Sequence, residues 1–243
     1  MQAQAQAGLL VIDAGNTRIK WGVHNGHMWR SSGTHATAES GSLVIPAASR
    51  AIASNVAGPT VEADLRTACA RVGASLQVIS SQPSQLGVTT CYRDAAQLGS
   101  DRWAALIAAH HEGRGHKLVV NAGTALTIDA LDADGHFLGG VIVPGPTLMR
   151  RSLDRGTAGL RLTEGVFADF PGSTPDAITT GALLAGTGAV MRMAEAMRAR
   201  GCPPERIILS GGAAAEIAPH LPFEVALREN LVLDGLVHIA RFS

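Results

Sequence analysis

The feature that most constrains the fold is a short turn sequence that occurs twice. The first copy, Val11-Ile-Asp-Ala-Gly-Asn-Thr-Arg-Ile-Lys-Trp-Gly22, runs from an apolar triplet into a polar and basic turn that contains glycine. The second copy, Val120-Asn-Ala-Gly-Thr-Ala-Leu-Thr-Ile-Asp129, repeats the pattern with Asn121 in the place of Asp13. Because each copy opens a series of alternating strand and helix patterns, we expect a duplicated α/β fold with two similar lobes around a cleft.

The domain boundary is expected near the middle of the 243-residue chain. The stretch from Gly113 to Lys117 interrupts a helical pattern, and a strand pattern begins again at Leu118. We therefore predict an N-terminal domain over residues 1–115 and a C-terminal domain over residues 116–243.

Apolar periodicity predicts the elements of both halves. Strands are expected over 9–12, 19–23, 51–56, 76–79, 118–120, 140–143 and 207–209, and helices over 60–72, 99–111, 174–200 and 231–242. Ser100 or Asp101 is expected to cap the N-terminus of the helix over 99–111. Thr174 is expected to cap the helix that begins at Pro175.

Composition and charge exclude several classes of protein. Hydrophobic residues make up 46% of the chain and charged residues 16%, which is typical of a globular fold. The formal net charge is +0, so the basic footprint of a general nucleic-acid binder is absent. The three cysteines lack metal-ligand spacing, and no apolar run is long enough to span a membrane. The expected location is the cytoplasm.

The repeated turn suits phosphate binding. A glycine turn directly after a buried strand exposes backbone N–H groups, and two such turns could hold a polyphosphate. In the first copy, Lys20 would add a mobile positive charge, and Asp13 could ligate Mg²⁺ or its waters. The alternative is an ordinary hairpin turn that needs Gly and Asn only for its backbone conformation. The turns contain neither the Walker A pattern nor GxGxxG.

Asp101 lies at the expected start of a helix, between Ser100 and Arg102. A carboxylate there could accept a proton from a substrate hydroxyl while Arg102 fixes an anion. The structural alternative is that an acidic residue simply stabilises the positive end of the helix dipole. The sequence leaves both interpretations open.

Taken together, the motifs resemble the type III pantothenate kinase family. The matching stretches are 13–22, Tyr92, 98–103, 123–125, 139–145, 156–158 and 210–212, and they follow the family order over nearly the whole chain. The resemblance implies two ribonuclease-H-like domains of the acetate and sugar kinase, actin and heat-shock ATPase superfamily. It also implies a homodimer that uses ATP and Mg²⁺ to phosphorylate pantothenate to 4'-phosphopantothenate, the first step toward coenzyme A.

The resemblance also assigns roles to individual residues. Asp101 would be the general base. The residues expected to bind ATP are Asp13, Ala14, Gly15, Asn16, Thr17, Arg18, Ile19, Lys20 and Thr124. The residues expected to bind pantothenate are Tyr92, Gly99, Ser100, Asp101, Arg102 and Thr174, the last reaching the site of the partner subunit.

The chain departs from the family pattern at Asn121. Many members carry aspartate there, where it ligates a monovalent cation such as K⁺ or NH₄⁺ beside the ATP phosphates. An amide oxygen can still coordinate a cation, but without the formal charge of a carboxylate. The sequence therefore predicts weakened, altered or absent cation binding.

Two other functions remain compatible with the sequence. The first is a non-catalytic accessory protein of the same fold, which would bind nucleotide without turnover. The second is a kinase of the same superfamily for another small hydroxy acid or a sugar. Asp13, Lys20, Asp101 and Arg102 favour an enzyme, and the stretch from Gly99 to Arg102 with Tyr92 favours pantothenate.

Overall fold

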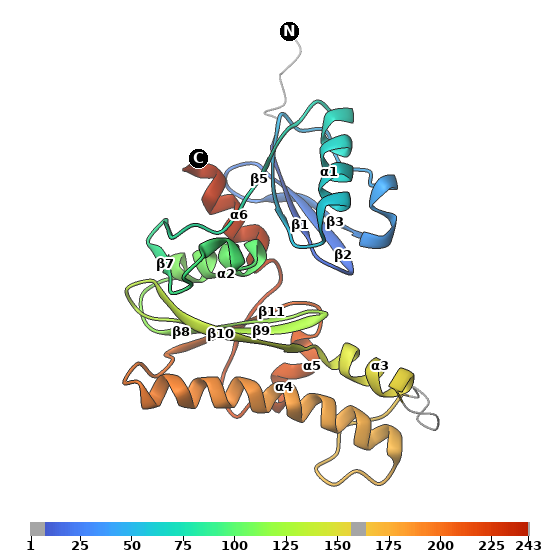
Figure 1. The fold of residues 1–243 in the computed structure, drawn as a ribbon, viewed down its shortest axis with the longest axis vertical. Helices are drawn as coiled ribbons and strands as arrows, with labels where there is room; N and C mark the ends of the chain where they lie inside the picture. Colours follow the sequence, from blue (N-terminus) through green and yellow to red (C-terminus); the bar gives the residue numbers. More distant parts are fainter. Residues whose placement is uncertain (1–7, 157–163, 243) are drawn as a thin grey trace. The chain divides into compact units, whose positions relative to one another are not determined.

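The computed structural model describes residues 8–156 and 164–242 (Figure 1). Contacts divide the chain into two compact units. The first unit comprises the residues up to Glu112 together with those from Leu231 onward, and the second comprises Gly113–Asn230. This division differs from the expected domains 1–115 and 116–243, because the last helix packs within the first unit.

The first unit is built on a sheet with the strand order β3-β2-β1-β4-β5. β1 is antiparallel to β2, and β2 is antiparallel to β3, whereas β1, β4 and β5 run parallel. The strands are β1 (Leu9–Ala14), β2 (Arg18–His24), β3 (Trp29–Ala36), β4 (Arg50–Asn55) and β5 (Ser75–Val78). The unit also contains the hairpin β6 (Ser84–Gln85) and β7 (Val88–Thr90), and the helices α1 (Pro59–Arg71), α2 (Ser100–His111) and α6 (Leu231–Arg241). Two 3₁₀ segments, η1 (Thr37–Ser42) and η2 (Ala95–Gln97), complete it.

The strands that belong to the second unit repeat this arrangement, in the order β10-β9-β8-β11-β12. Its strands are β8 (Lys117–Ala122), β9 (Ala125–Leu131), β10 (His136–Pro144), β11 (Arg206–Ser210) and β12 (Ala226–Arg228). β8 is antiparallel to β9 and parallel to β11, as β1 is to β2 and β4. The helices are α3 (Pro146–Gly156), α4 (Thr174–Ala199) and α5 (Ala214–Ile217), and η3 spans Ala218–His220. The equivalent strand orders confirm the duplicated α/β fold.

Each unit has its own hydrophobic core. The first centres on the buried run of β1, which packs with α1 residues such as Leu65. The second centres on Leu118 and Val120 of β8, which pack with α4 residues such as Leu183. Because apolar runs in β1 and β8 are covered by helices, burial favours the central position of both strands in their sheets.

Close packing explains why α6 joins the first unit. α2 and α6 pack against each other, and a Cβ on Gly235 would overlap the carbonyl oxygen of Ala104 in α2. Only glycine permits this approach between the helices. The sequence shows α6 as an amphipathic helix, but nothing local in it identifies α2 as the partner.

The caps expected at Ser100 or Asp101 and at Thr174 were wrong. Gly99 occupies the N-cap of α2 and makes no side-chain cap, so Ser100 is the first helical residue. Ser173 is the N-cap of α4, where its hydroxyl accepts a 3.3 Å hydrogen bond from the backbone N–H of Asp176. Thr174 is therefore inside the helix, because the neighbouring serine provides the cap instead.

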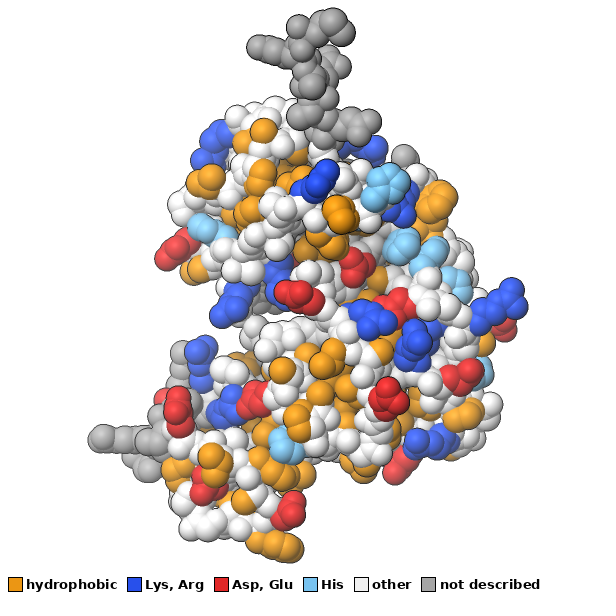
Figure 2. All heavy atoms as spheres, turned by 180° about the vertical axis from the view of Figure 1, so that it is seen from behind, with side chains coloured by type: hydrophobic (Ala, Val, Ile, Leu, Met, Phe, Trp, Pro, Cys, Tyr) orange, Lys and Arg blue, Asp and Glu red, His pale blue; other side chains and the backbone are white. Residues whose placement is uncertain are grey.

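The surface carries no single dominant charge in the view of Figure 2, where basic and acidic side chains are interspersed. Within the ranges that the structure describes, no helix combines the length and the apolar character needed to cross a membrane. The thiols of Cys69 and Cys202 are buried and that of Cys91 is exposed, and all three are free.

Candidate functional site

Asp13 ends the apolar run of β1 and lies directly opposite Lys20 of β2. Its Oδ1 atom is buried and has no hydrogen-bond partner among the described residues. Burial raises the pKa of Asp13 to about 7, with a further contribution from the charge of Asp101, while Lys20 opposes the shift. A buried carboxylate oxygen without a partner is a site where a cation can bind.

The backbone of the β1–β2 turn is fixed by hydrogen bonds. The N–H of Gly15 donates to the carbonyl oxygen of Arg18 at 3.1 Å. The hydroxyl of Thr37 donates to the carbonyl oxygen of Gly15 at 2.7 Å, and the N–H of Thr37 donates to that of Thr17 at 3.1 Å. The turn is therefore held in one conformation.

The sequence expectation treated residues 13–20 as one binding stretch, but the structure divides them. Asn16, Thr17 and Arg18 are exposed at the turn. The side chains of Ala14 and Ile19 are fully buried in the core of the first unit. These two residues can therefore contribute to a ligand site only through their backbone.

Asp101 lies in the first turn of α2. Its Oδ1 accepts a 2.8 Å hydrogen bond from the backbone N–H of Arg102. Burial raises the pKa of Asp101, whereas that hydrogen bond and the charge of Arg102 lower it. The net shift is upward, which makes the ionised carboxylate a stronger proton acceptor than an exposed aspartate.

Gly99 leaves room for this carboxylate. A Cβ at position 99 would lie 2.5 Å from Oδ1 of Asp101. Glycine at the N-cap is therefore required by the position of the carboxylate, rather than by an unusual backbone conformation.

Arg102 and Tyr92 lie side by side. Arg102 is only 5% exposed, and its Nη1 donates to the hydroxyl of Tyr92 at 3.3 Å. Its guanidinium carbon lies 6.0 Å from the centre of the tyrosine ring. A cation at that distance interacts favourably with an aromatic face. The structure thus brings together two residues that the sequence placed in one substrate site.

Two serines that the sequence analysis missed hold the start of α2 in place. Ser54, fully buried in β4, shares a 2.9 Å hydroxyl–hydroxyl hydrogen bond with Ser100. Ser81 donates from its hydroxyl to the carbonyl oxygen of Leu98 at 2.7 Å. Ser54 is also the neighbour of Asp13 in the pairing of β1 with β4. Only the polar end of a mostly apolar strand could have marked Ser54 in the sequence.

The remaining expected residues lie in the second unit. Asn121 occupies the position in β8 that Asp13 occupies in β1, with Ser210 beside it in β11. Thr124 is exposed in the β8–β9 turn, and its carbonyl oxygen accepts a 2.8 Å hydrogen bond from the N–H of Gly145. Thr174 is exposed at the start of α4.

The structure thus brings several of the expected residues close together within the first unit. Asp13 and Lys20 face each other, Asp101 lies near enough to influence the pKa of Asp13, and Arg102 contacts Tyr92. The stretch over 156–158, which also carried the family resemblance, extends beyond the described residues at 157.

Comparisons with known proteins identify the family. The family model for type III pantothenate kinase matches residues 9–196. A type III pantothenate kinase from Nitrosospira multiformis is 45% identical over 239 residues, covering 96% of this chain and 91% of the relative. Another, from Dechloromonas aromatica, is 42% identical over 237 residues, covering 96% of this chain and 98% of the relative.

The fold also matches a solved structure from Campylobacter jejuni, described as a candidate transcriptional activator of the Baf family. That structure has a TM-score of 0.63 at 19% identity and covers 96% of this chain and 98% of its own. The two mixed sheets and the structural neighbours are those of the sugar kinase, actin and heat-shock ATPase fold, with two ribonuclease-H-like domains. The chain belongs to the type III pantothenate kinase family.

Proposed function

We propose that this protein transfers the γ-phosphoryl group of ATP to pantothenate, giving 4'-phosphopantothenate in the first step of coenzyme A biosynthesis. The observation that carries the proposal is Asp101, a partly buried carboxylate with a raised pKa at the start of α2. It belongs to a chain whose family model is type III pantothenate kinase. A carboxylate in that environment suits the removal of a proton from an alcohol.

In the proposed reaction, Asp101 accepts the proton of the primary hydroxyl of pantothenate. The hydroxyl oxygen then forms a bond to the γ-phosphorus, and the bond between that phosphorus and the leaving oxygen of ADP breaks. Lys20 stabilises negative charge on the phosphoryl oxygens. Most of the rate enhancement in such a reaction comes from positioning and electrostatics.

The residues present fit a divalent cation. The buried, unpartnered Oδ1 of Asp13 is an oxygen ligand of the type that Mg²⁺ prefers. Bound Mg²⁺ would supply charge neutralisation for the ATP phosphates. We assign the backbone and side chains of the β1–β2 turn to ATP, with Thr124 of the second unit as a further ATP-binding residue.

We assign pantothenate to the start of α2. Arg102 would bind the carboxylate of pantothenate, and its contact with Tyr92 would hold the guanidinium in one orientation. Gly99 and Ser100 would provide backbone and hydroxyl contacts beside Asp101. Thr174 remains a proposed contact from the partner subunit.

We also propose a homodimer and a monovalent-cation site. The exposed face of α4 carries small residues at Gly181, Ala185 and Gly188, next to the exposed apolar side chains of Leu184 and Met191. A second copy could approach such a face closely and cover its apolar atoms. Asn121 is the proposed position for K⁺ or NH₄⁺. An ATP-dependent reaction of this kind is expected in the cytoplasm.

The test is ADP release from the purified protein with ATP and Mg²⁺. Pantothenate should support turnover, and other small hydroxy acids and sugars should not. Replacing Asp101 with Asn should lower kcat about 100- to 10,000-fold, because the general base is lost. The melting temperature of Asp101→Asn should remain within a few degrees of that of the parent protein.

Asp169→Asn is the matched control, because Asp169 is an exposed residue of the second unit and is none of the expected ligand-binding residues. It should retain the parental rate. Turnover only with a substrate other than pantothenate would show that the protein is a kinase of different substrate specificity. The absence of turnover with any substrate would favour a non-catalytic accessory protein. A near-parental rate in Asp101→Asn would remove the role of base from this residue.

A further inference from the structure

A second potential binding site lies at the opposite ends of the strands that carry Asp13. A cavity of about 300 Å³ is lined by the beginnings of β1 and β4, the end of β2 with its turn, and the last turns of α6. Asp13 lies four residues beyond Leu9 along β1, which corresponds to about 13 Å at the usual rise of a strand. The cavity is therefore separate from the candidate catalytic group.

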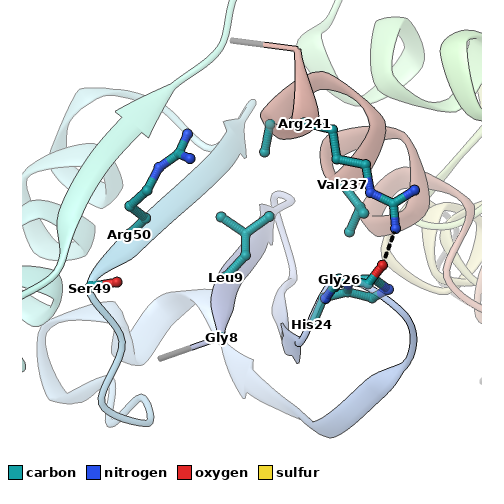
Figure 3. A pocket seen from close by; sticks show the side chains of 9 residues that line it. Gly8, Leu9, His24, Gly26, Ser49, Arg50, Val237 and Arg241 are labelled. Atoms are coloured by element: carbon teal, nitrogen blue, oxygen red, sulfur yellow. Dashed lines mark hydrogen bonds between the residues drawn. The ribbon is translucent and has the colours of Figure 1, made fainter. Parts of the chain in front are cut away.

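The cavity combines an apolar floor with basic side chains. Figure 3 shows Leu9 between Arg50 of β4 on one side and Arg241 of α6 on the other. Val237 and Ala240 add apolar surface from α6. None of the lining residues that the structure describes is acidic. Because the whole chain has a formal net charge of +0, this concentration of positive charge is local.

The two arginines differ in how they are held. Arg241 donates from Nη2 to the carbonyl oxygen of Gly26 at 2.5 Å, which anchors its guanidinium at the β2–β3 turn. The side chain of Arg50 makes no hydrogen bond or ion pair with any residue in the described ranges. A guanidinium has five N–H donors, so both residues retain donors for an anion.

His24 also lines the cavity. It is buried, and its Nδ1 accepts a 3.0 Å hydrogen bond from the N–H of Gly26, which places the proton of the neutral ring on Nε2. Its ring also packs edge-on against Trp29. Burial lowers the pKa of His24, and the charges of Arg241 and His27 lower it further. The charges around this ring are thus predominantly positive.

We propose that this cavity binds a small organic anion, in which a phosphate is joined to a short apolar segment. Arg50 and Arg241 would bind the phosphate, since guanidinium groups match phosphate oxygens in geometry and charge. Leu9 and Val237 would contact the apolar segment. A volume of about 300 Å³ is at the lower end of the range for small-molecule sites.

The experiment is a titration of the isotope-labelled full chain with n-butyl phosphate, followed by two-dimensional NMR. The amide of Gly26 and the ring of His24 should shift and saturate. Inorganic phosphate should bind more weakly and 1-butanol should not bind, because each lacks one half of the proposed ligand. Arg50→Gln should raise the apparent Kd at least about tenfold, which corresponds to the loss of one charge-assisted hydrogen bond.

Two controls separate this site from other anion sites. Arg192→Gln removes the same charge from an exposed position on α4 and should leave the Kd unchanged. Lys20→Ala should also leave the shifts at Gly26 and His24 unchanged, since Lys20 belongs to the candidate ATP site. The absence of saturable shifts, an unchanged Kd in Arg50→Gln, or shifts that disappear in Lys20→Ala would overturn the proposal.

Discussion

The two halves of the molecule share a strand order but differ in charge at the equivalent turn. In the first unit, Asp13 of β1 faces Lys20 of β2. In the second unit, Asn121 of β8 faces Thr127 of β9. The adjacent parallel strand carries a buried serine in both halves, Ser54 or Ser210. The duplication thus preserved the backbone frame and the serine while the ionisable pair is present in one copy only.

The difference has a cost that falls on the first unit alone. An ionised carboxylate loses far more hydration on burial than an amide does. Asp13 bears this cost, as its raised pKa shows, and Asn121 avoids it. At this position the first half therefore has a carboxylate that lowers its stability and can act in catalysis, whereas the second half has neither the cost nor the charge.

The largest effect is expected from making the first turn resemble the second. Asp13→Asn should lower kcat about 100-fold or more, because it removes the proposed ligand of Mg²⁺. The same variant should be more stable than the parent at pH 8 when ligand and metal are absent. With a folded-state pKa near 7 against an ordinary value of 3.8, the gain is on the order of a few kcal/mol.

Asp13 destabilises the folded parent at high pH because it ionises at a lower pH in the unfolded state than in the folded state. As the pH rises from about 4, the unfolded parent loses its proton first, so the folded parent is progressively destabilised until the pH passes about 7. Chemical denaturation of both proteins in EDTA at pH 5 and pH 8 measures the difference. An equal stability difference at the two pH values would contradict this account of Asp13.

An intermediate effect is expected from the serine that both halves share. Ser54→Ala should lower kcat about tenfold, because it frees the hydroxyl of Ser100 and allows the start of α2 to shift Asp101. The KM for ATP should change little. Ser210→Ala is the matched substitution in the second half and should affect kcat much less.

A double-mutant cycle distinguishes positioning from general destabilisation. Ser54→Ala and Ser100→Ala remove the two ends of one hydrogen bond, so their effects on kcat should not add. Additive losses, or an equal loss in Ser210→Ala, would show that Ser54 has no particular role in placing Asp101.

The smallest effect is expected from the reverse exchange in the second turn. Asn121→Asp should strengthen activation by K⁺ or NH₄⁺ by a few-fold, since a carboxylate adds formal charge to an oxygen ligand. Rates measured against K⁺, NH₄⁺ and Na⁺ at constant ionic strength test this. An unchanged cation response would remove that role from position 121.

Much of this contrast could be predicted from the sequence. The apolar run before Asp13 and the echo around Asn121 indicated two equivalent strands, because burial of a central strand leaves a local pattern. The helix expected over 99–111 was also close to α2 (Ser100–His111). Local signals of this kind identify elements and the turns that carry chemistry.

What the sequence could not predict depends on contacts between distant residues. The hydrogen bond between Ser54 and Ser100 joins positions far apart in the chain, and neither residue has a pattern that names the other. The packing of Gly235 on Ala104 is equally nonlocal. The choice of Ser173 over Thr174 as N-cap was a competition between neighbours with nearly equal propensity.

The position of α6 also has a consequence for folding of the chain during translation. The second unit is one continuous stretch, so all of its strands have been translated before residues 231–241 emerge from the ribosome. The first unit begins earlier but needs α6 to cover α2. Long-range contacts of this kind delay folding, because the chain between the partners must be made and ordered first. The unit that carries Asp13 and Asp101 is therefore the first to begin translation and the last to be completed. α6 can cover the apolar surface of α2 only after the whole second unit has been synthesised.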